Sequence, residues 1–150
     1  MHLTRASLIT LAFALPVGAA YRVPSTPQGP VVTVYKSPTC GCCRKWVELM
    51  KGAGFAITVH DMDDVDPVKN RQHVPNDLRS CHTALVGGYV IEGHVPIDLV
   101  QKLLKEHPKV AGLSVPGMVM GSPGMEGGAK EAYDVVSFDN TGKSAVYAKR

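Results

Sequence analysis

Hydrophobic and polar residues follow one another along the chain in patterns that predict alternating strands and helices. Residues 31–35 are β-branched or aromatic and lie between prolines, which predicts a buried strand. Apolar side chains then recur at helical spacing over residues 46–50, and two glycines mark the end of this helix. Residues 55–60 are again rich in β-branched side chains. We therefore predict a βαβ unit whose two strands are parallel and whose crossover is right-handed.

The middle of the chain predicts a short helix, a hairpin and a longer helix. Acidic residues and a proline introduce the short helix over residues 68–73. Two β-rich runs, residues 80–86 and 89–93, flank a Gly-Gly pair, which is typical of a β-hairpin. A proline opens the helix over residues 96–107, whose apolar face recurs at helical spacing. The order β-α-β-α-β-β-α matches the thioredoxin architecture, so the predicted fold class is α/β.

The two ends of the chain lie outside this unit. Arg5, an apolar run and small residues before Tyr21 form the pattern of a cleaved secretory signal. The apolar run is shorter than the roughly 20 residues that an uncleaved membrane anchor needs. A Pro-rich leader follows, and a Gly-, Pro- and Met-rich extension ending in a β-hairpin closes the chain. The predicted parts are a signal peptide, an extended leader, a thioredoxin-like domain and a C-terminal metal-binding extension, over residues 1–20, 21–30, 31–109 and 110–150.

Size and charge exclude several classes of function. About 130 residues remain after the signal, which is enough for one domain with a single core. Cleavage lowers the formal charge from +3 to +2, because Arg5 is the only charged residue in the signal. This charge is too small and too dispersed for a nucleic-acid surface. No other stretch is long enough to cross a bilayer and no pattern demands an obligate interface, so we expect an exported monomer.

Three of the four cysteines lie in Cys40-Gly41-Cys42-Cys43, on the predicted turn from the first strand into the first helix. Unpaired backbone N–H groups and the positive end of the helix dipole favour thiolates there. Cys40 and Cys43 can face each other, whereas Cys42 points elsewhere, so we expect the three sulfurs to span a surface rather than converge. Purely structural disulfides fit poorly, because such close spacing cannot staple distant parts of a fold.

The fourth cysteine and the methionines extend this sulfur-rich set. In a thioredoxin-like fold the segment entering the third strand packs beside the cysteine turn, so four sulfurs should meet at one end of the sheet. Three methionines lie in the Gly/Pro-rich extension, which has little core to fill. Thiolates with thioethers select Cu(I), and bridging of several ions fits divergent sulfurs better than one tetrahedral site. The candidate ligands are Cys40, Cys42, Cys43, Cys81, Met118, Met120, Met125, His82 and His94.

Other functions remain open from the residues alone. Cys40 and Cys43 could serve as the attacking and resolving thiols of a thiol-disulfide oxidoreductase. Against this, Cys42 would compete as a resolving thiol, and the stretch around Cys81 lacks the proline that redox-active thioredoxins place opposite their active site. An arsenate-reductase-like enzyme would need a cytoplasmic supply of reductant, which the signal argues against. A structural or interaction module with incidental cysteines is the remaining alternative.

Four motifs together resemble those of the CopG-type copper-resistance proteins of Gram-negative bacteria, formerly known only as a domain of unknown function. The resemblance runs from about residue 31 to residue 149. The motifs are Tyr35-Lys36-Ser37-Pro38-Thr39-Cys40-Gly41-Cys42-Cys43, Ser80-Cys81-His82-Thr83, Gly88-Tyr89-Val90-Ile91-Glu92-Gly93-His94-Val95-Pro96, and Val115-Pro116-Gly117-Met118 with Gly121-Ser122-Pro123-Gly124-Met125.

This resemblance implies a thioredoxin-like domain whose C-terminal extension helps to bind copper. It also implies a cysteine-bridged, multinuclear copper site and a role in periplasmic copper tolerance, with interconversion of Cu(I) and Cu(II) as one way to exert it. A copper oxidoreductase activity is therefore a hypothesis, and no residue is assigned as catalytic. Periplasmic copper-efflux components are candidate partners for copper transfer.

Overall fold

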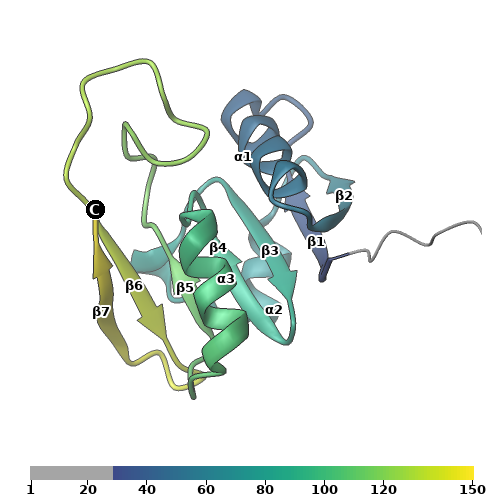
Figure 1. Cartoon of the computed structure of the whole chain (residues 1–150). Coiled ribbons are helices and arrows are strands. Elements are labelled where there is room, and N and C mark those ends of the chain that lie inside the picture. Colours follow the sequence, from purple (N-terminus) through teal and green to yellow (C-terminus); the bar gives the residue numbers. More distant parts are fainter. Residues whose placement is uncertain (1–28) are drawn as a thin grey trace, which may run out of the picture.

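One seven-stranded mixed sheet runs through residues 29–150, the part of the chain that this computed structural model describes (Figure 1). The predicted signal peptide and most of the predicted leader lie outside the described residues. The strands lie side by side in the order β2-β1-β3-β4-β5-β6-β7. Their bounds are β1 Val31–Lys36, β2 Ala56–Asp61, β3 His82–Val86, β4 Tyr89–Glu92, β5 Gly112–Ser114, β6 Asp134–Phe138 and β7 Ser144–Lys149.

Helices cover both faces of this sheet. They are α1 (Gly41–Gly52), α2 (Asp66–Arg71) and α3 (Ile97–Glu106), with a 3-10 turn over Asn76–Leu78. In Figure 1, α1 and α3 lie in front of the sheet and α2 lies behind it. The carboxylate of Asp64 accepts a hydrogen bond from the Asp66 amide at 2.8 Å just before α2, but the N-cap residue of this helix is Val65, which makes no capping bond with its side chain. Within the described residues, no helix combines the length and hydrophobicity that crossing a membrane requires.

The first four strands have the connections of a thioredoxin-like domain. β1 pairs in parallel with β2, which follows α1, and in antiparallel with β3 on its other side. β3 and β4 form the predicted hairpin. Gly87 and Gly88 have φ angles of 57° and 85°, which a tight hairpin turn requires and which glycine adopts without strain. The element order, the parallel βαβ unit and the C-terminal hairpin β6–β7 are thereby confirmed.

β5 is the element that the sequence pattern did not predict. It pairs in parallel with β4 and in antiparallel with β6, so the C-terminal extension continues the sheet. A Cβ atom on Gly112 would lie 2.1 Å from the carbonyl oxygen of Val90. Gly112 weakens the strand pattern in the sequence, and the same glycine allows β5 to lie close to β4.

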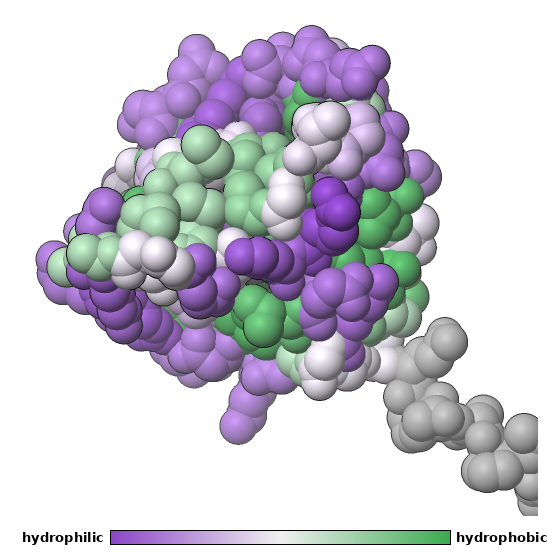
Figure 2. Space-filling model, turned by 90° about the horizontal axis from the view of Figure 1, so that it is seen from above, coloured by the Kyte–Doolittle hydropathy of each residue, from purple (hydrophilic) through white to green (hydrophobic). Residues whose placement is uncertain are grey.

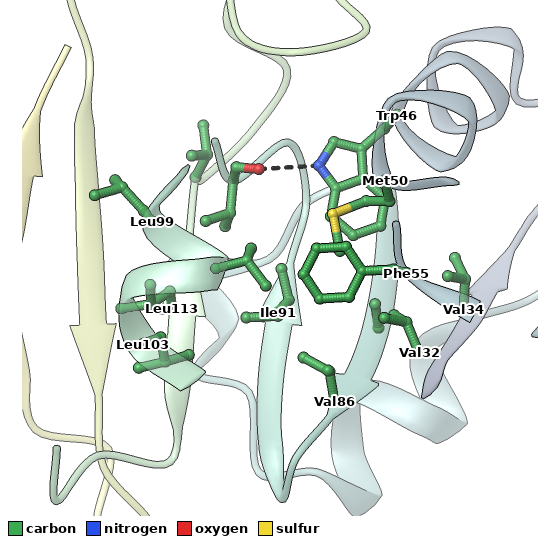
Figure 3. Close-up of a cluster of buried hydrophobic side chains, with 14 of the residues drawn as sticks. Val32, Val34, Trp46, Met50, Phe55, Val86, Ile91, Leu99, Leu103 and Leu113 are labelled. Atoms are coloured by element: carbon green, nitrogen blue, oxygen red, sulfur yellow. Dashed lines mark hydrogen bonds between the residues drawn. The ribbon is translucent and has the colours of Figure 1, made fainter. Parts of the chain in front are cut away.

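The main core fills the space between the sheet and the helices α1 and α3 (Figure 3). It is built from Val32, Val34, Val86, Ile91 and Leu113 of the sheet, Trp46 and Met50 of α1, and Leu99 and Leu103 of α3. The Trp46 indole N–H donates a 3.0 Å hydrogen bond to the carbonyl oxygen of Val95, drawn as a dashed line in Figure 3. This bond holds the middle of α1 against the segment that carries His94.

Candidate metal centre

The Cys-Gly-Cys-Cys turn forms the beginning of α1. Cys40 is the N-cap residue, and its Sγ accepts a hydrogen bond from the Cys43 amide at 3.3 Å. Cys40 and Cys43 are joined by a disulfide, whereas Cys42 and Cys81 are free thiols. The described form of the site therefore holds two oxidised and two reduced cysteines.

The four sulfur atoms of this site lie together. Cys81 immediately precedes β3, and the Sγ atoms of all four cysteines lie within 4.8 Å of one another, as the fold assignment predicted. The Sγ atoms of Cys40 and Cys42 are 3.4 Å apart. The expectation that the sulfurs of the turn would span a surface is wrong, because Cys40 precedes the helix. Its extended backbone (φ −71°, ψ 99°) takes it out of the helical rotation on which that expectation rested.

His94 presents a nitrogen lone pair to Cys81. Its Nδ1 lies 2.8 Å from the carbonyl oxygen of Pro123, which can only accept, so Nδ1 carries the proton. Its Nε2 lies 3.0 Å from the Sγ of Cys81. Histidines that bind metals commonly donate their other ring N–H to a carbonyl group in this way. His94 is thus oriented for a metal ion placed next to Cys81.

His82 is fully buried and packs against the rings of Trp46 and His94. Its Nδ1 lies 3.4 Å from the Sγ of Cys81, whereas its Nε2 finds no hydrogen-bond partner in the described chain. Burial lowers the pKa of His82 well below its usual range, and neighbouring basic side chains act in the same direction. The ring is therefore neutral near pH 7, which is the form that binds metals.

Cys81 belongs to two groups of candidate ligands. Its Sγ is part of the cysteine cluster, and it also lies within 4.8 Å of the ring nitrogens of His82 and His94. Burial raises the pKa of the Cys81 thiol to about 11, and the neighbouring Cys42 contributes in the same direction. The thiol is therefore protonated at neutral pH, and a metal ion that binds it must displace that proton.

The loop between β5 and β6 packs against the cysteine turn at Gly124. This residue has a φ of +88°, and a Cβ atom there would lie 2.7 Å from the carbonyl oxygen of Cys42 and 3.0 Å from the amide nitrogen of Trp46. Sequence reasoning gave no role to Gly124 or to the Pro123 carbonyl that orients His94. In the sequence, these two residues belong to the Gly-Ser-Pro-Gly run, which was noted only as part of a family motif.

The three methionines of the extension have different surroundings. Met118 is 61 % exposed, whereas Met120 and Met125 are half-buried. Gly117, which precedes Met118, bridges to Ser80 beside Cys81. Met125 directly follows Gly124, whose backbone contacts the cysteine turn. Met120 packs its terminal methyl group over Gly128. The backbone thus brings Met118 and Met125 to the neighbourhood of the cysteines, while Met120 faces its own loop.

Figure 2 views the molecule from above Figure 1, at the end where this loop approaches the beginning of α1. A pale green area of moderately hydrophobic residues occupies this face and is bordered by hydrophilic side chains. The buried histidines and the cysteines belong to the same end of the molecule, because Gly124 contacts both the Cys42 carbonyl and the His94 ring.

Comparisons with known proteins find similarity over nearly all of the described chain. A family model described as "Protein of unknown function, DUF411" matches residues 78–125, which include Cys81, His82 and His94. Two solved structures entitled "Copper resistance protein copG", forms 1 and 2, are 40 % and 39 % identical to this chain. Each superposes with a TM-score of 0.76 and covers 81 % of this chain and 98 % of its own. The comparison with curated proteins finds no match.

Proposed function

Because this chain belongs to the family of the CopG copper resistance proteins, we propose that it binds copper ions in the periplasm as part of copper resistance. The observation that carries the proposal is the convergence of four cysteine Sγ atoms within 4.8 Å of one another. Thiolates are soft ligands that select Cu(I), and imidazole suits copper as well. Copper is here the cargo of the protein.

The ring nitrogens of two histidines support a bound metal ion. The Nε2 atom of His82 is buried without a hydrogen-bond partner among the described residues, which is uncommon for a polar atom in a folded protein. His94 holds its Nε2 lone pair toward Cys81 while its other nitrogen is fixed by a carbonyl group. Both arrangements suit ligand atoms whose partner is an ion, so the residues present fit copper.

The proposal includes more than one copper ion per chain. The cysteine cluster and the Cys81–His82–His94 group share one atom, the Sγ of Cys81. A thiolate sulfur can bridge two ions, so Cys81 is the ligand that we expect to join the two groups. The thioethers of Met118, Met120 and Met125 are proposed as additional ligands, which makes residues 110–150 a metal-binding extension.

Copper binding by all four thiolates requires the reduced form of the turn. An external dithiol that reduces the Cys40–Cys43 disulfide by thiol–disulfide exchange is itself oxidised to a disulfide and leaves two thiols here, whose deprotonation provides two further ligands. We propose that this form holds Cu(I) and that interconversion of Cu(I) and Cu(II) belongs to the function, with one electron per ion exchanged with an external redox partner. Export through the predicted signal and copper transfer to efflux components complete the proposal.

The disulfide itself favours a second candidate function, thiol-disulfide exchange through Cys40 and Cys43. The variant Cys42→Ser separates the two candidates, because Cys42 is a thiol of the cluster but not part of the disulfide. If the four cysteines bind copper, this variant binds fewer Cu(I) ions per reduced chain than the parent protein, while the disulfide still forms. If the variant keeps the full copper stoichiometry, Cys42 is not a ligand and the proposed cluster is wrong.

A further inference from the structure

A buried ion pair lies behind the candidate metal centre and has no role in the function proposed so far. The Nζ of Lys69 lies 2.5 Å from Oε1 of Glu92, and the two residues are only 4 % and 0 % exposed. The Thr83 hydroxyl lies between them, donating to Oε2 of Glu92 at 2.7 Å and accepting from Lys69 at 3.1 Å. Because burying two charges is costly, such a pair is weak evidence for stability alone.

The same carboxylate reaches the segment that carries Cys81. Oε1 of Glu92 accepts a hydrogen bond from the Ser80 amide at 2.7 Å, and Ser80 directly precedes Cys81. Within residues 29–150, this amide has no other hydrogen-bond acceptor. Burial raises the pKa of Glu92, whereas the Lys69 charge and the donated hydrogen bonds favour its carboxylate form.

Ser80 is held on its other sides as well. Its hydroxyl donates to the carbonyl oxygen of Gly117, which directly precedes Met118 of the extension. A Cβ atom on Gly93 would lie 2.4 Å from the Ser80 Oγ, so the β4 end closes directly over this side chain. The Glu92 carboxylate is the charged group of this arrangement that contacts the backbone next to Cys81.

We propose that Glu92 is a positioning residue of the copper site, which holds the Ser80 amide and thereby fixes Cys81 beside His94 and the cysteine turn. Lys69 compensates the charge of this buried carboxylate. The inference rests on the proposed copper site and adds a residue that touches no copper. Cys81 needs such support because it precedes β3 and lies outside the regular strand.

Two double variants isolate the hydrogen bond from the buried charges. Lys69→Met with Glu92→Gln removes both charges but keeps an amide oxygen that can accept from Ser80. Lys69→Met with Glu92→Leu removes the charges and the acceptor. Both replace a buried ion pair by groups of similar size, a change that proteins often tolerate. The single variant Thr83→Val serves as a control that removes a buried hydrogen bond but leaves the Ser80 contact in place.

Two properties are measured on the exported chain after reduction. The first is the affinity for Cu(I), by competition with a chromophoric Cu(I) chelator. The second is the alkylation rate of Cys81 relative to Cys42 in the metal-free protein, by peptide mass spectrometry. We expect the Glu92→Leu pair to weaken Cu(I) binding about tenfold or more, since a hydrogen bond to a charged group is worth about that factor. The relative alkylation rate of Cys81 should change with it, and the Glu92→Gln pair and Thr83→Val should resemble the parent protein in both.

Each outcome bears on one of the two proposals. If the parent protein binds no Cu(I), the proposed function fails. If the Glu92→Leu pair binds Cu(I) and reacts at Cys81 like the parent, or if both double variants lose binding equally, the positioning role of Glu92 is wrong. Should the Glu92→Leu pair fail to fold, amide hydrogen exchange of the parent protein tests whether Glu92 holds the Ser80 amide. Strong protection of the Ser80 amide supports the inference, and exchange at the rate of an unstructured peptide contradicts it.

Discussion

Gly124 is the residue through which the C-terminal loop contacts the cysteine turn. Any side chain there meets the Cys42 carbonyl at 2.7 Å and must also adopt a φ of +88°. We predict that Gly124→Ala lowers the free energy of unfolding by about 1–3 kcal/mol, from the combined overpacking and backbone strain. Because the Pro123 carbonyl moves with this loop, His94 should lose its orientation and Cu(I) affinity should fall.

Gly142→Ala is the matched control for this prediction, measured by denaturant unfolding and Cu(I) competition. Gly142 has a nearly identical φ of +85°, but nothing lies within 4 Å of the position that a Cβ atom would take there. In Gly142→Ala, the free energy of unfolding should therefore fall only by the cost of backbone strain. The Cu(I) affinity should equal that of the parent protein. Equal loss of affinity in both variants would show that the close contact at Gly124 does not matter to the site.

The buried histidine His82 predicts a definite pH dependence of stability. Burial lowers its pKa in the folded protein, so below a pH of about 6.5 the unfolded chain binds a proton that the folded chain does not. The free energy of unfolding of the metal-free, disulfide form should therefore fall as the pH falls, by up to about 1.4 kcal/mol per pH unit from this residue. Above the unfolded pKa the contribution vanishes.

Denaturant unfolding between pH 7.5 and about pH 5 checks this prediction. His82→Gln should flatten the profile, whereas replacement of the exposed His60 by Gln should leave it unchanged. A profile of His82→Gln as steep as that of the parent protein would mean that another group causes the acid sensitivity.

At the level of elements, β5 joins the C-terminal extension to the thioredoxin-like unit. Leu113 in this strand is fully buried in the main core. We predict that Leu113→Ala costs about 2–5 kcal/mol of unfolding free energy, as expected for a buried leucine whose removal leaves a cavity. Val146→Ala in β7, where the side chain is 54 % exposed, should stay within about 0.5 kcal/mol of the parent.

Denaturant unfolding with one cooperative transition is the measurement for both variants. A loss for Leu113→Ala no larger than that for Val146→Ala would mean that the extension does not share the core. A second transition that only Leu113→Ala shifts would mean that the extension unfolds independently of the first four strands.

The elements with regular periodicity could be predicted from the sequence, and those built on glycine could not. β1, α1, the β3–β4 hairpin and α3 follow from their own apolar spacing and turn residues. β5 has only three residues, and the first of them, Gly112, lies in close contact with β4. Its pairing depends on β4 and β6 rather than on its own side chains, so the spacing of apolar residues does not reveal it.

The candidate site shows the same division. The meeting of Cys81 with the cysteine turn could be predicted, because the element order determines which strand end adjoins α1. The closeness of the Cys40 and Cys42 sulfurs could not, because it depends on the extended backbone of an N-cap residue. The carboxylate of Glu92 contacts the segment before Cys81 only once β3 and β4 pair, so no local pattern revealed it.

At the scale of the whole molecule, the site is assembled from segments that are far apart in the sequence. The start of α1, the residues before β3, the segment between β4 and α3, and the loop after β5 each contribute a part. Copper bound among them would connect the thioredoxin-like unit to its extension. Ligands that bind only the folded state stabilise it by mass action. The copper-loaded protein should therefore unfold at a higher denaturant concentration than the metal-free protein.

We propose above all that this protein holds more than one copper ion through its cysteines. The most direct test is elemental analysis of the protein purified from a copper-supplemented periplasm, combined with a count of free thiols before and after a copper chelator. We predict more than one copper ion per chain and the appearance of free thiols when the chelator removes copper. Metal-free protein with a Cys40–Cys43 disulfide, which takes up no copper after reduction, would rule out the copper site and favour thiol-disulfide exchange.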